Sequence, residues 1–178
     1  TGGMPVSLEG KRIAVFAEEQ YQVLELWYPL LRFKEAGAEV QVVGSGRSDV
    51  FRSKEGYPVK VDVNAADVRG ADFDAVVVPG GYAPDLMRVS DDMVRVVREA
   101  HEAGQVVAAI CHAGWVLASA GVLEGKRATC VRNIRDDIVH AGATYVDEEV
   151  VVDGNVITSR TPPDLPAFCR EIIRALGG

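Results

Sequence analysis

The sequence lacks long hydrophobic runs, blocks of basic residues and a zinc-binding pattern of cysteines. Its longest apolar runs have about five residues, whereas a transmembrane helix needs about 20, and no secretory signal is visible. With 19 basic and 26 acidic residues the net charge is −7, so the basic patch typical of nucleic-acid binding is missing. An odd number of cysteines (Cys111, Cys130 and Cys169) fits a reducing compartment. We expect a cytoplasmic protein that binds neither nucleic acid nor a membrane.

Three motifs of proteins with related architectures are also absent. The loop after the first predicted strand reads Glu18-Glu19-Gln20. It has no glycine fingerprint of a dinucleotide-binding dehydrogenase and no Ser/Thr-rich phosphate loop of a flavodoxin, and its carboxylates would repel phosphate. A glutamine amidotransferase would carry a His-x-Glu motif late in the chain, but His140 is followed by Ala141 and Gly142. We expect no cofactor and no metal ion.

What the chain does contain is an alternation of short apolar runs with amphipathic segments. The apolar runs predict buried strands at residues 12–17, 39–43, 75–78 and 105–109, and a short strand at 127–130. They also predict a hairpin or an excursion at the sheet edge at 50–61, and a hairpin at 150–158. Helical spacing and capping residues predict helices at 21–36, 91–103, 115–120, 134–141 and 164–176.

This alternation predicts an α/β fold. We expect a three-layer sandwich with a mostly parallel sheet and helices on both faces, as in flavodoxin-like and class I glutamine amidotransferase-like proteins. Residues 1–10 are expected to form an N-terminal tail, in which 1–3 precede the natural start at Met4, and residues 11–178 form a single domain. Ligands of such sheets bind beyond the carboxyl ends of the strands.

The most informative stretch is Ala109-Ile110-Cys111-His112-Ala113-Gly114. A predicted strand leads into it and a predicted helix follows, so Cys111 is expected at a sharp strand-to-helix turn. Unpaired N–H groups and the positive end of the helix dipole there favour the thiolate, and the same geometry with serine is the nucleophile elbow. A cysteine that is simply buried in the core is the alternative. Cys130 and Cys169 are expected to be structural.

Five other residues are candidates for the same site. The N–H groups of Gly80 and Gly81, which follow the strand at 75–78, can form an oxyanion hole with that of His112, or the two glycines can mark an ordinary turn. Glu25 lies among apolar helix residues, where burial would raise its pKa, or it faces solvent. His112 follows the nucleophile directly. Successive side chains at an elbow are expected to point in different directions, so His112 needs an orienting partner to act as its base. Asp85, in the loop after the glycines, could supply that carboxylate, or it is a surface residue.

Several segments together resemble the ThiJ/PfpI superfamily, most closely its PfpI branch of intracellular cysteine proteases and general stress proteins. The resemblance covers residues 11–176. It is carried by the segments Glu25-Leu26-Trp27-Tyr28-Pro29, Val78-Pro79-Gly80-Gly81-Tyr82-Ala83-Pro84-Asp85, Ala109-Ile110-Cys111-His112, Ser119-Ala120-Gly121-Val122-Leu123, Asp136-Asp137, Val150-Val151-Val152-Asp153-Gly154-Asn155 and Ser159-Arg160-Thr161-Pro162.

The resemblance implies roles for the candidate residues. Cys111 would be the nucleophile, His112 its histidine, and Glu25 a buried, protonated carboxyl beside the sulfur. The N–H groups of Gly81 and His112 would form the oxyanion hole. In the PfpI proteases a glutamate of a neighbouring subunit completes the triad, and Asp85 occupies that position here with a side chain one methylene shorter.

Two further departures change the expected pocket. Gln22 stands where close relatives often have a second carboxylate, and Val131 where some have tyrosine, so the pocket is expected to be less acidic and more apolar than in the proteases.

Three functions are consistent with these residues. The first is a stress-response cysteine hydrolase of the peptidase type, acting as a homodimer or larger homo-oligomer on peptides. The second is a cofactor-free glyoxalase or protein deglycase, in which Cys111 attacks small reactive aldehydes. The third is a redox sensor or chaperone, in which Cys111 is oxidised to a sulfinate stabilised by Glu25.

Overall fold

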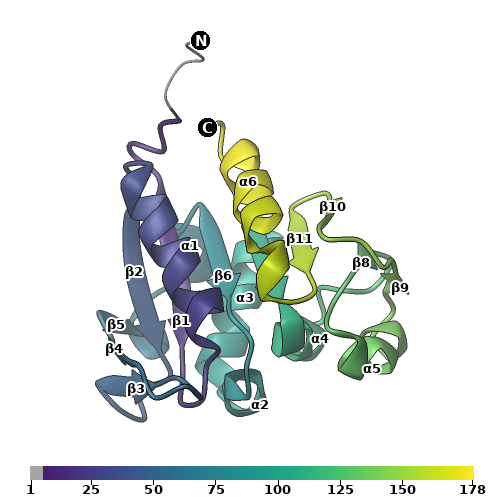
Figure 1. Cartoon of the computed structure of the whole chain (residues 1–178), viewed down its shortest axis with the longest axis horizontal. Helices are drawn as coiled ribbons and strands as arrows, with labels where there is room; N and C mark the ends of the chain where they lie inside the picture. The colour runs from purple at the N-terminus through teal and green to yellow at the C-terminus, as the bar shows by residue number, and fades with distance from the viewer. Residues whose placement is uncertain (1–5) are drawn as a thin grey trace.

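A computed structural model describes residues 6–178, so the expected extension at residues 1–3 and half of the tail lie outside the described residues (Figure 1). The strands are β1 (Arg12–Ala17), β2 (Glu39–Gly44), β3 (Val50–Arg52), β4 (Pro58–Lys60), β5 (Val63–Asn64), β6 (Ala75–Val78), β7 (Val106–Ile110), β8 (Arg127–Ala128), β9 (Thr144–Tyr145), β10 (Val151–Asp153) and β11 (Val156–Ser159). The α-helices are α1 (Val23–Glu35), α2 (Ala83–Met87), α3 (Asp91–Glu102), α4 (Gly114–Ala120), α5 (Arg135–His140) and α6 (Leu165–Ala175).

Seven strands form one sheet in the order β10-β11-β7-β6-β1-β2-β5. All neighbouring strands run parallel except β10, which pairs antiparallel with β11 in the predicted hairpin. Helices α1 and α6 lie on one face, and α3 and α4 lie on the other (Figure 1). This arrangement confirms the three-layer, mostly parallel α/β fold.

The central strands are apolar along their whole length because helices cover both of their faces. Every residue of β6 (AVVV) and β7 (VVAAI) is buried. Strand order reverses between β1 and β6: the chain moves outward from β1 to β2 and then returns to the other side of β1. A crevice forms at such a reversal, beyond the carboxyl ends of the strands. The segments that follow β1, β6 and β7 therefore meet there.

Several local boundaries differ from the sequence expectations. The predicted strand at 127–130 is reduced to β8, which pairs with the unforeseen β9. The predicted helix at 134–141 begins with a short 3₁₀ turn, Arg132–Ile134, before α5. Asp85 lies in the first turn of α2 and not in a loop, because Pro84 at the start of that segment favours helical backbone. Each difference concerns elements of six residues or fewer, for which periodicity carries little information.

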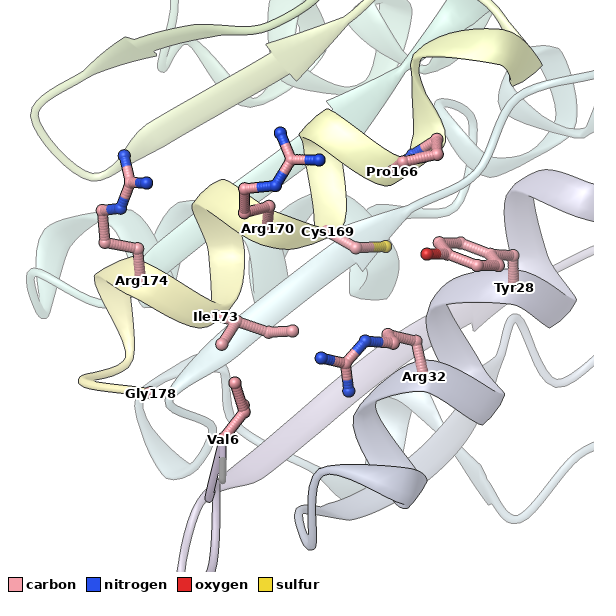
Figure 2. Close-up of a pocket in the computed structure, with 9 residues that line it drawn as sticks. All are labelled: Val6, Tyr28, Arg32, Pro166, Cys169, Arg170, Ile173, Arg174 and Gly178. Atoms are coloured by element: carbon pink, nitrogen blue, oxygen red, sulfur yellow. The ribbon is translucent and has the colours of Figure 1, made fainter. Parts of the chain in front are cut away.

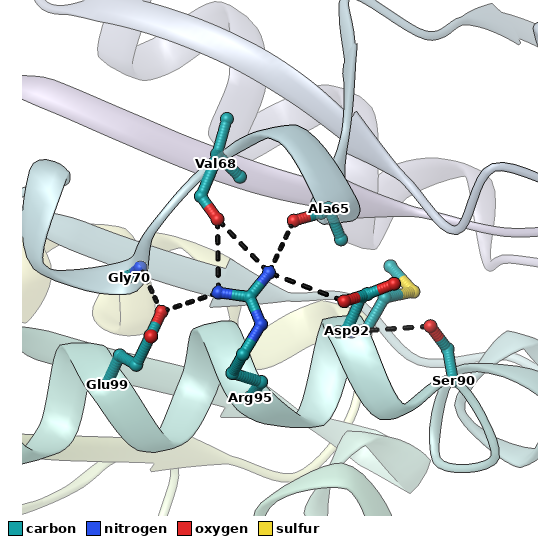
Figure 3. Close-up of polar contacts among 8 residues, drawn as sticks. Ala65, Val68, Gly70, Ser90, Asp92, Arg95 and Glu99 are labelled. Atoms are coloured by element: carbon teal, nitrogen blue, oxygen red, sulfur yellow. Dashed lines mark hydrogen bonds and ion pairs between the residues drawn. The ribbon is translucent and has the colours of Figure 1, made fainter.

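The connection between β5 and β6 is held by Arg95 of α3 (Figure 3). Its guanidinium donates to the carbonyl oxygens of Ala65, at 2.9 Å, and Val68, at 3.2 Å, and it pairs with Glu99 at 2.8 Å. Glu99 in turn accepts a hydrogen bond from the N–H of Gly70 at 3.0 Å. These contacts fix an irregular segment against α3, with its backbone polar groups satisfied by side chains.

Candidate active site

Cys111 lies at a strained strand-to-helix turn. It follows β7 directly and opens a 3₁₀ turn, Cys111–Ala113, from which α4 continues at Gly114. Its φ angle is 64°, in the left-handed region that side-chain-bearing residues rarely adopt. Strain of this kind is typical of functional positions, where the surrounding structure holds the residue in place. The predicted elbow is therefore present, with the sulfur at the carboxyl edge of the sheet.

The ring of His112 is close to the sulfur. Nδ1 of His112 lies 3.4 Å from Sγ of Cys111, so the expectation that adjacent side chains at the elbow diverge is wrong. The left-handed backbone at Cys111 turns the chain sharply enough for the two side chains to meet. Trp115, one turn along, packs a tilted ring at 5.2 Å from the imidazole, and its indole N–H is held by Asp137 at 2.9 Å. Burial lowers the pKa of His112, which favours the neutral ring.

Glu25 is fully buried in the first turn of α1 and faces the same crevice. Its Oε1 accepts a hydrogen bond from the N–H of Gly80 at 2.9 Å, whereas Oε2 has no hydrogen-bond partner in residues 6–178. Gln22 caps the helix by accepting from the N–H of Glu25 at 2.8 Å, which fixes the position of the carboxyl. Burial raises the pKa of Glu25 from 4.5 to about 7. The direction of this shift is the one expected for a carboxyl among apolar helix residues.

The two glycines after β6 have separate tasks. The N–H of Gly80 binds Glu25, so its expected place in the oxyanion hole is wrong. The N–H groups of Gly81 and His112 face the sulfur of Cys111. A Cβ at position 80 would lie 2.6 Å from Oε1 of Glu25 and 2.7 Å from Cβ of Cys111, so only glycine fits between them. Two backbone donors therefore remain for a developing oxyanion.

The expected low pKa of Cys111 is not found. Burial, and next the negative charge of Glu25, raise the pKa of this thiol to about 12, against the opposing effect of the two N–H groups. The elbow supplies N–H hydrogen bonds as predicted, but α4 has only seven residues and stabilises the thiolate little. Desolvation of the half-buried sulfur destabilises the thiolate by more than these groups stabilise it. The two groups are coupled: when Glu25 is protonated, its repulsion of the thiolate disappears.

The pocket above the sulfur has a volume of about 150 Å³ and contains a residue that sequence reasoning missed. It is lined by Gln22, Glu25, Lys54, Gly81, Tyr82, Cys111, His112 and Pro162. Lys54 comes from the turn of the β3–β4 hairpin, far from the other members in sequence. No chemical motif surrounds it, and only the fold of the hairpin brings it to the site.

Asp85 does not join this group within one chain. It is exposed on α2 and is absent from the lining of the pocket. Within residues 6–178 the imidazole of His112 has no carboxylate partner, and its only hydrogen-bond contact is with Sγ of Cys111. The structure thus brings together Cys111, His112, Glu25 and Gly81, and leaves Asp85 outside.

Larger depressions occur elsewhere but hold no comparable chemistry. A cleft of about 310 Å³ between α1 and α6 contains Arg32, Cys169 and Ile173 (Figure 2).

Burial raises the pKa of Cys169 and of Cys130 to about 12, and both are 1% exposed. This agrees with the structural roles predicted for them. Within residues 6–178, no group of three or more His, Cys, Asp or Glu side chains is placed to hold a metal ion.

The part of the chain that the structure describes includes no helix with the length and apolar character needed to cross a bilayer.

Known proteins are similar to this chain in sequence and in fold. The chain is 42% identical to Deglycase PfpI of Pyrococcus furiosus over 165 residues (93% of this chain and 99% of that protein). It is 40% identical to General stress protein 18 of Bacillus subtilis over 169 residues (94% and 98%). A crystal structure from Anabaena variabilis, of a two-domain protein with DJ-1/ThiJ/PfpI-like and ferritin-like domains, matches 94% of the chain with a TM-score of 0.92 and 43% identity. The chain spans 48% of that larger protein.

The family model described as DJ-1/PfpI matches residues 11–175, which is nearly the whole length over which the motifs resemble the superfamily. The chain therefore belongs to the DJ-1/PfpI family.

Proposed function

We propose that this protein is a cofactor-free glyoxalase and deglycase that converts reactive α-oxoaldehydes, free or added to amines, into 2-hydroxy acids. The observation that carries the proposal is the small pocket in which Cys111 faces a buried carboxyl with a pKa of about 7. A carboxyl that titrates near neutral pH can both accept and donate a proton during one reaction. The relative named Deglycase PfpI supports the same chemistry.

The first step is addition of the sulfur to the aldehyde carbon. Neutral His112, 3.4 Å from Sγ, takes the thiol proton as the C–S bond forms. This assistance matters because the thiol has a raised pKa and is protonated at rest. The N–H groups of Gly81 and His112 hold the oxygen, which receives the proton from the imidazole and gives a hemithioacetal.

The second step moves a hydrogen along the substrate. The carboxylate of Glu25 removes the proton from the former aldehyde carbon and leaves an enediolate. The hydroxyl proton of the hemithioacetal passes to the neighbouring oxygen, and protonated Glu25 returns its proton to the adjacent carbon. The product is a thioester with a 2-hydroxy group. Water then attacks the thioester, the C–S bond breaks and the thiol is restored. In sum, one α-oxoaldehyde and one water give one 2-hydroxy acid, without an external oxidant or reductant.

The same steps apply to the hemiaminal that an α-oxoaldehyde forms with an amine. When the aldehyde has added to an amine, the C–N bond of the hemiaminal breaks, which releases the amine and the aldehyde carbon for attack by Cys111. The amine is recovered unchanged, and the carbon skeleton leaves as the 2-hydroxy acid.

Peptidase chemistry is a second candidate, and it depends on a second copy of the chain. Hydrolysis of an amide requires His112 to protonate a poor leaving group, and an orienting carboxylate would hold the imidazole for this task. We propose that Asp85 of a neighbouring copy supplies this carboxylate in a homo-oligomer. Its exposure on α2 leaves it free to do so.

A substrate panel tests the proposal. Glyoxal, methylglyoxal, a methylglyoxal adduct of N-acetyl-lysine and a fluorogenic peptide are compared with the wild type and with Cys111→Ala. We expect 2-hydroxy acid from the aldehydes and the adduct, none of it with the variant, and slower or no peptide cleavage. Peptide cleavage without aldehyde turnover would reject the glyoxalase and deglycase assignment.

A further inference from the structure

Lys54 is held at the mouth of the Cys111 pocket by backbone contacts and not by a flexible loop. Tyr21 forms isolated β-bridges to Ser53 on one side and to Gly81 on the other. The N–H of Lys54 donates to the carbonyl oxygen of Tyr21 at 2.9 Å. The hydroxyl of Tyr21 donates to the carbonyl oxygen of Tyr57 at 2.7 Å, which secures the far end of the hairpin turn. The backbone of Lys54 is therefore tied to the segment that carries Gly81.

The ammonium group of Lys54 makes no ion pair with any residue of 6–178. Its nearest aromatic neighbour is Tyr82, whose ring centroid is 5.7 Å from Nζ and which lines the same pocket. The adjacent acid, Glu55, is engaged elsewhere, because its Oε1 accepts the N–H of Val23 at 3.0 Å at the start of α1. A cation on a fixed backbone, without an ion-pair partner in residues 6–178, therefore lines the same pocket as the nucleophile.

The charge of Lys54 reaches every reacting group of the site. It lowers the pKa of Glu25, of Cys111 and of His112. In a pocket of about 150 Å³ any substrate attached to the sulfur lies within a few ångströms of the lining. A lysine in this position acts as a compact point charge that attracts an anionic group.

We propose that Lys54 selects substrates in which the reacting carbonyl is followed, a few bonds away, by a carboxylate. The chemical class is that of short α-oxoaldehydes with an acid at the other end, such as 4,5-dioxopentanoate. This inference rests on the proposed function for the nature of the reaction. The aldehyde carbon binds Cys111, and the carboxylate lies between Nζ of Lys54 and the exposed mouth of the pocket.

The experiment compares 4,5-dioxopentanoate with its uncharged methyl ester in wild type, Lys54→Met and Lys60→Met. Lys60 is the matched control, since it is an exposed lysine on the same hairpin that does not line the pocket. The measured quantity is the ratio of kcat/KM for acid to ester, because any change in the nucleophile affects both substrates alike. We expect a ratio of about ten in wild type and Lys60→Met, and about one in Lys54→Met. The wild-type ratio should fall at 0.5 M NaCl.

A binding measurement separates this proposal from the proposed function. The unreactive ketoacid 4-oxopentanoate should protect Cys111 from iodoacetamide in wild type and Lys60→Met but not in Lys54→Met, and its methyl ester should protect all three weakly. Turnover with equal ratios in wild type and Lys54→Met would overturn the role of Lys54 and leave the glyoxalase assignment intact. Protection that depends on Lys54, without turnover of either substrate, would support anion selection and reject the glyoxalase assignment. Equal protection in all three proteins would reject the role of Lys54, whether or not the enzyme turns over aldehydes.

Discussion

Nδ1 of His112 lies 3.4 Å from Sγ of Cys111, although the two residues are consecutive in the chain. The contact requires the left-handed backbone of Cys111, and it gives the sulfur a proton acceptor that no distant segment has to provide. Because burial keeps the thiol protonated, this contact determines how the nucleophile forms. Glu25 lines the same pocket, and its protonation changes the pKa of the Cys111 thiol.

Replacement of Glu25 by glutamine should make Cys111 more reactive above neutral pH. The amide has no charge, so the repulsion that raises the pKa of the thiol is removed, and the N–H of Gly80 keeps an acceptor. Each unit by which the pKa falls gives up to tenfold faster alkylation below the pKa, and we expect roughly this factor at pH 8 with iodoacetamide. Glu25→Leu, which also loses the acceptor, should gain less. Slower alkylation in Glu25→Gln would contradict this prediction. It would mean that in the wild type Cys111 ionises before Glu25, and that the protonated carboxyl stabilises the thiolate by donating a hydrogen bond to Sγ.

The same substitution should change how stability depends on pH. The pKa of Glu25 is about 7 in the folded chain against 4.5 when unfolded, so the folded state binds the proton more tightly. This favourable contribution is complete below about pH 4.5 and is lost as the pH rises through 7. The free energy of unfolding of Glu25→Gln relative to wild type should therefore rise by about 3 kcal/mol between pH 4 and pH 8.

Urea unfolding at the two pH values measures this difference. The exposed Glu9 provides a control, since Glu9→Gln should follow wild type to within about 0.5 kcal/mol at both. A constant difference between Glu25→Gln and wild type would show that the pKa of Glu25 is not raised by folding.

Dilute peroxide should oxidise Cys111 before Cys130 and Cys169. Burial raises the pKa of all three thiols to about 12, so the order depends on access. Cys111 is only half-buried at the open edge of the sheet, whereas the other two are 1% exposed. Peptide mapping by mass spectrometry at increasing peroxide gives the order. Modification of Cys130 or Cys169 at lower peroxide than Cys111 would contradict it.

Gly80→Ala should disrupt the site while the fold persists. The added methyl group would press on Oε1 of Glu25 and on Cβ of Cys111, at 2.6 and 2.7 Å. Displacement of reacting groups by about 1 Å can cost roughly 100-fold in rate, and we expect a loss of this size in kcat/KM. Gly125→Ala is the control, because a Cβ there has no neighbour within 4 Å and only the strain of a positive φ remains. Similar kcat/KM for both variants and wild type would show that the position of Gly80 is not critical.

Mixed oligomers can test the proposed role of Asp85. Asp85→Ala should lower peptide turnover and leave alkylation of Cys111 unchanged, since the residue lies outside the pocket of its own chain. Chains with Asp85→Ala and chains with Cys111→Ala should regain part of the activity when combined, because some sites then pair an intact Cys111 with an intact Asp85. Full activity of Asp85→Ala alone, with no gain in verified mixed oligomers, would show that His112 obtains no help from this residue.

The parts of the site that follow from local sequence were predictable. The apolar run before Cys111 and the small residues after it define a strand, a sharp turn and a helix, which places the nucleophile. Glu25 could be suspected because its helical neighbours are apolar. The order of elements was sufficient to predict a parallel sheet, and hence that the segments after β1, β6 and β7 share one edge.

The remaining features depend on tertiary packing, which no local pattern records. Two adjacent glycines do not reveal which N–H faces Glu25 and which faces the sulfur. The pKa of Cys111 depends on how deeply the whole fold buries the thiol, and this burial raises it. The position at a helix N-terminus, considered alone, would predict a lowered pKa. Lys54 reaches the site only because Tyr21 bridges the hairpin and the glycine segment at once.

The contacts of Arg95 join α3 and the connection between β5 and β6 into one unit of local unfolding. Because Glu99 binds both Arg95 and the N–H of Gly70, fraying of α3 would release the carbonyl oxygens of Ala65 and Val68 together with that N–H (Figure 3). The amide hydrogen of Gly70 should therefore exchange with solvent at the same rate as those of the middle of α3, although it belongs to an irregular segment. An apparently loose connection then has the kinetic protection of a helix.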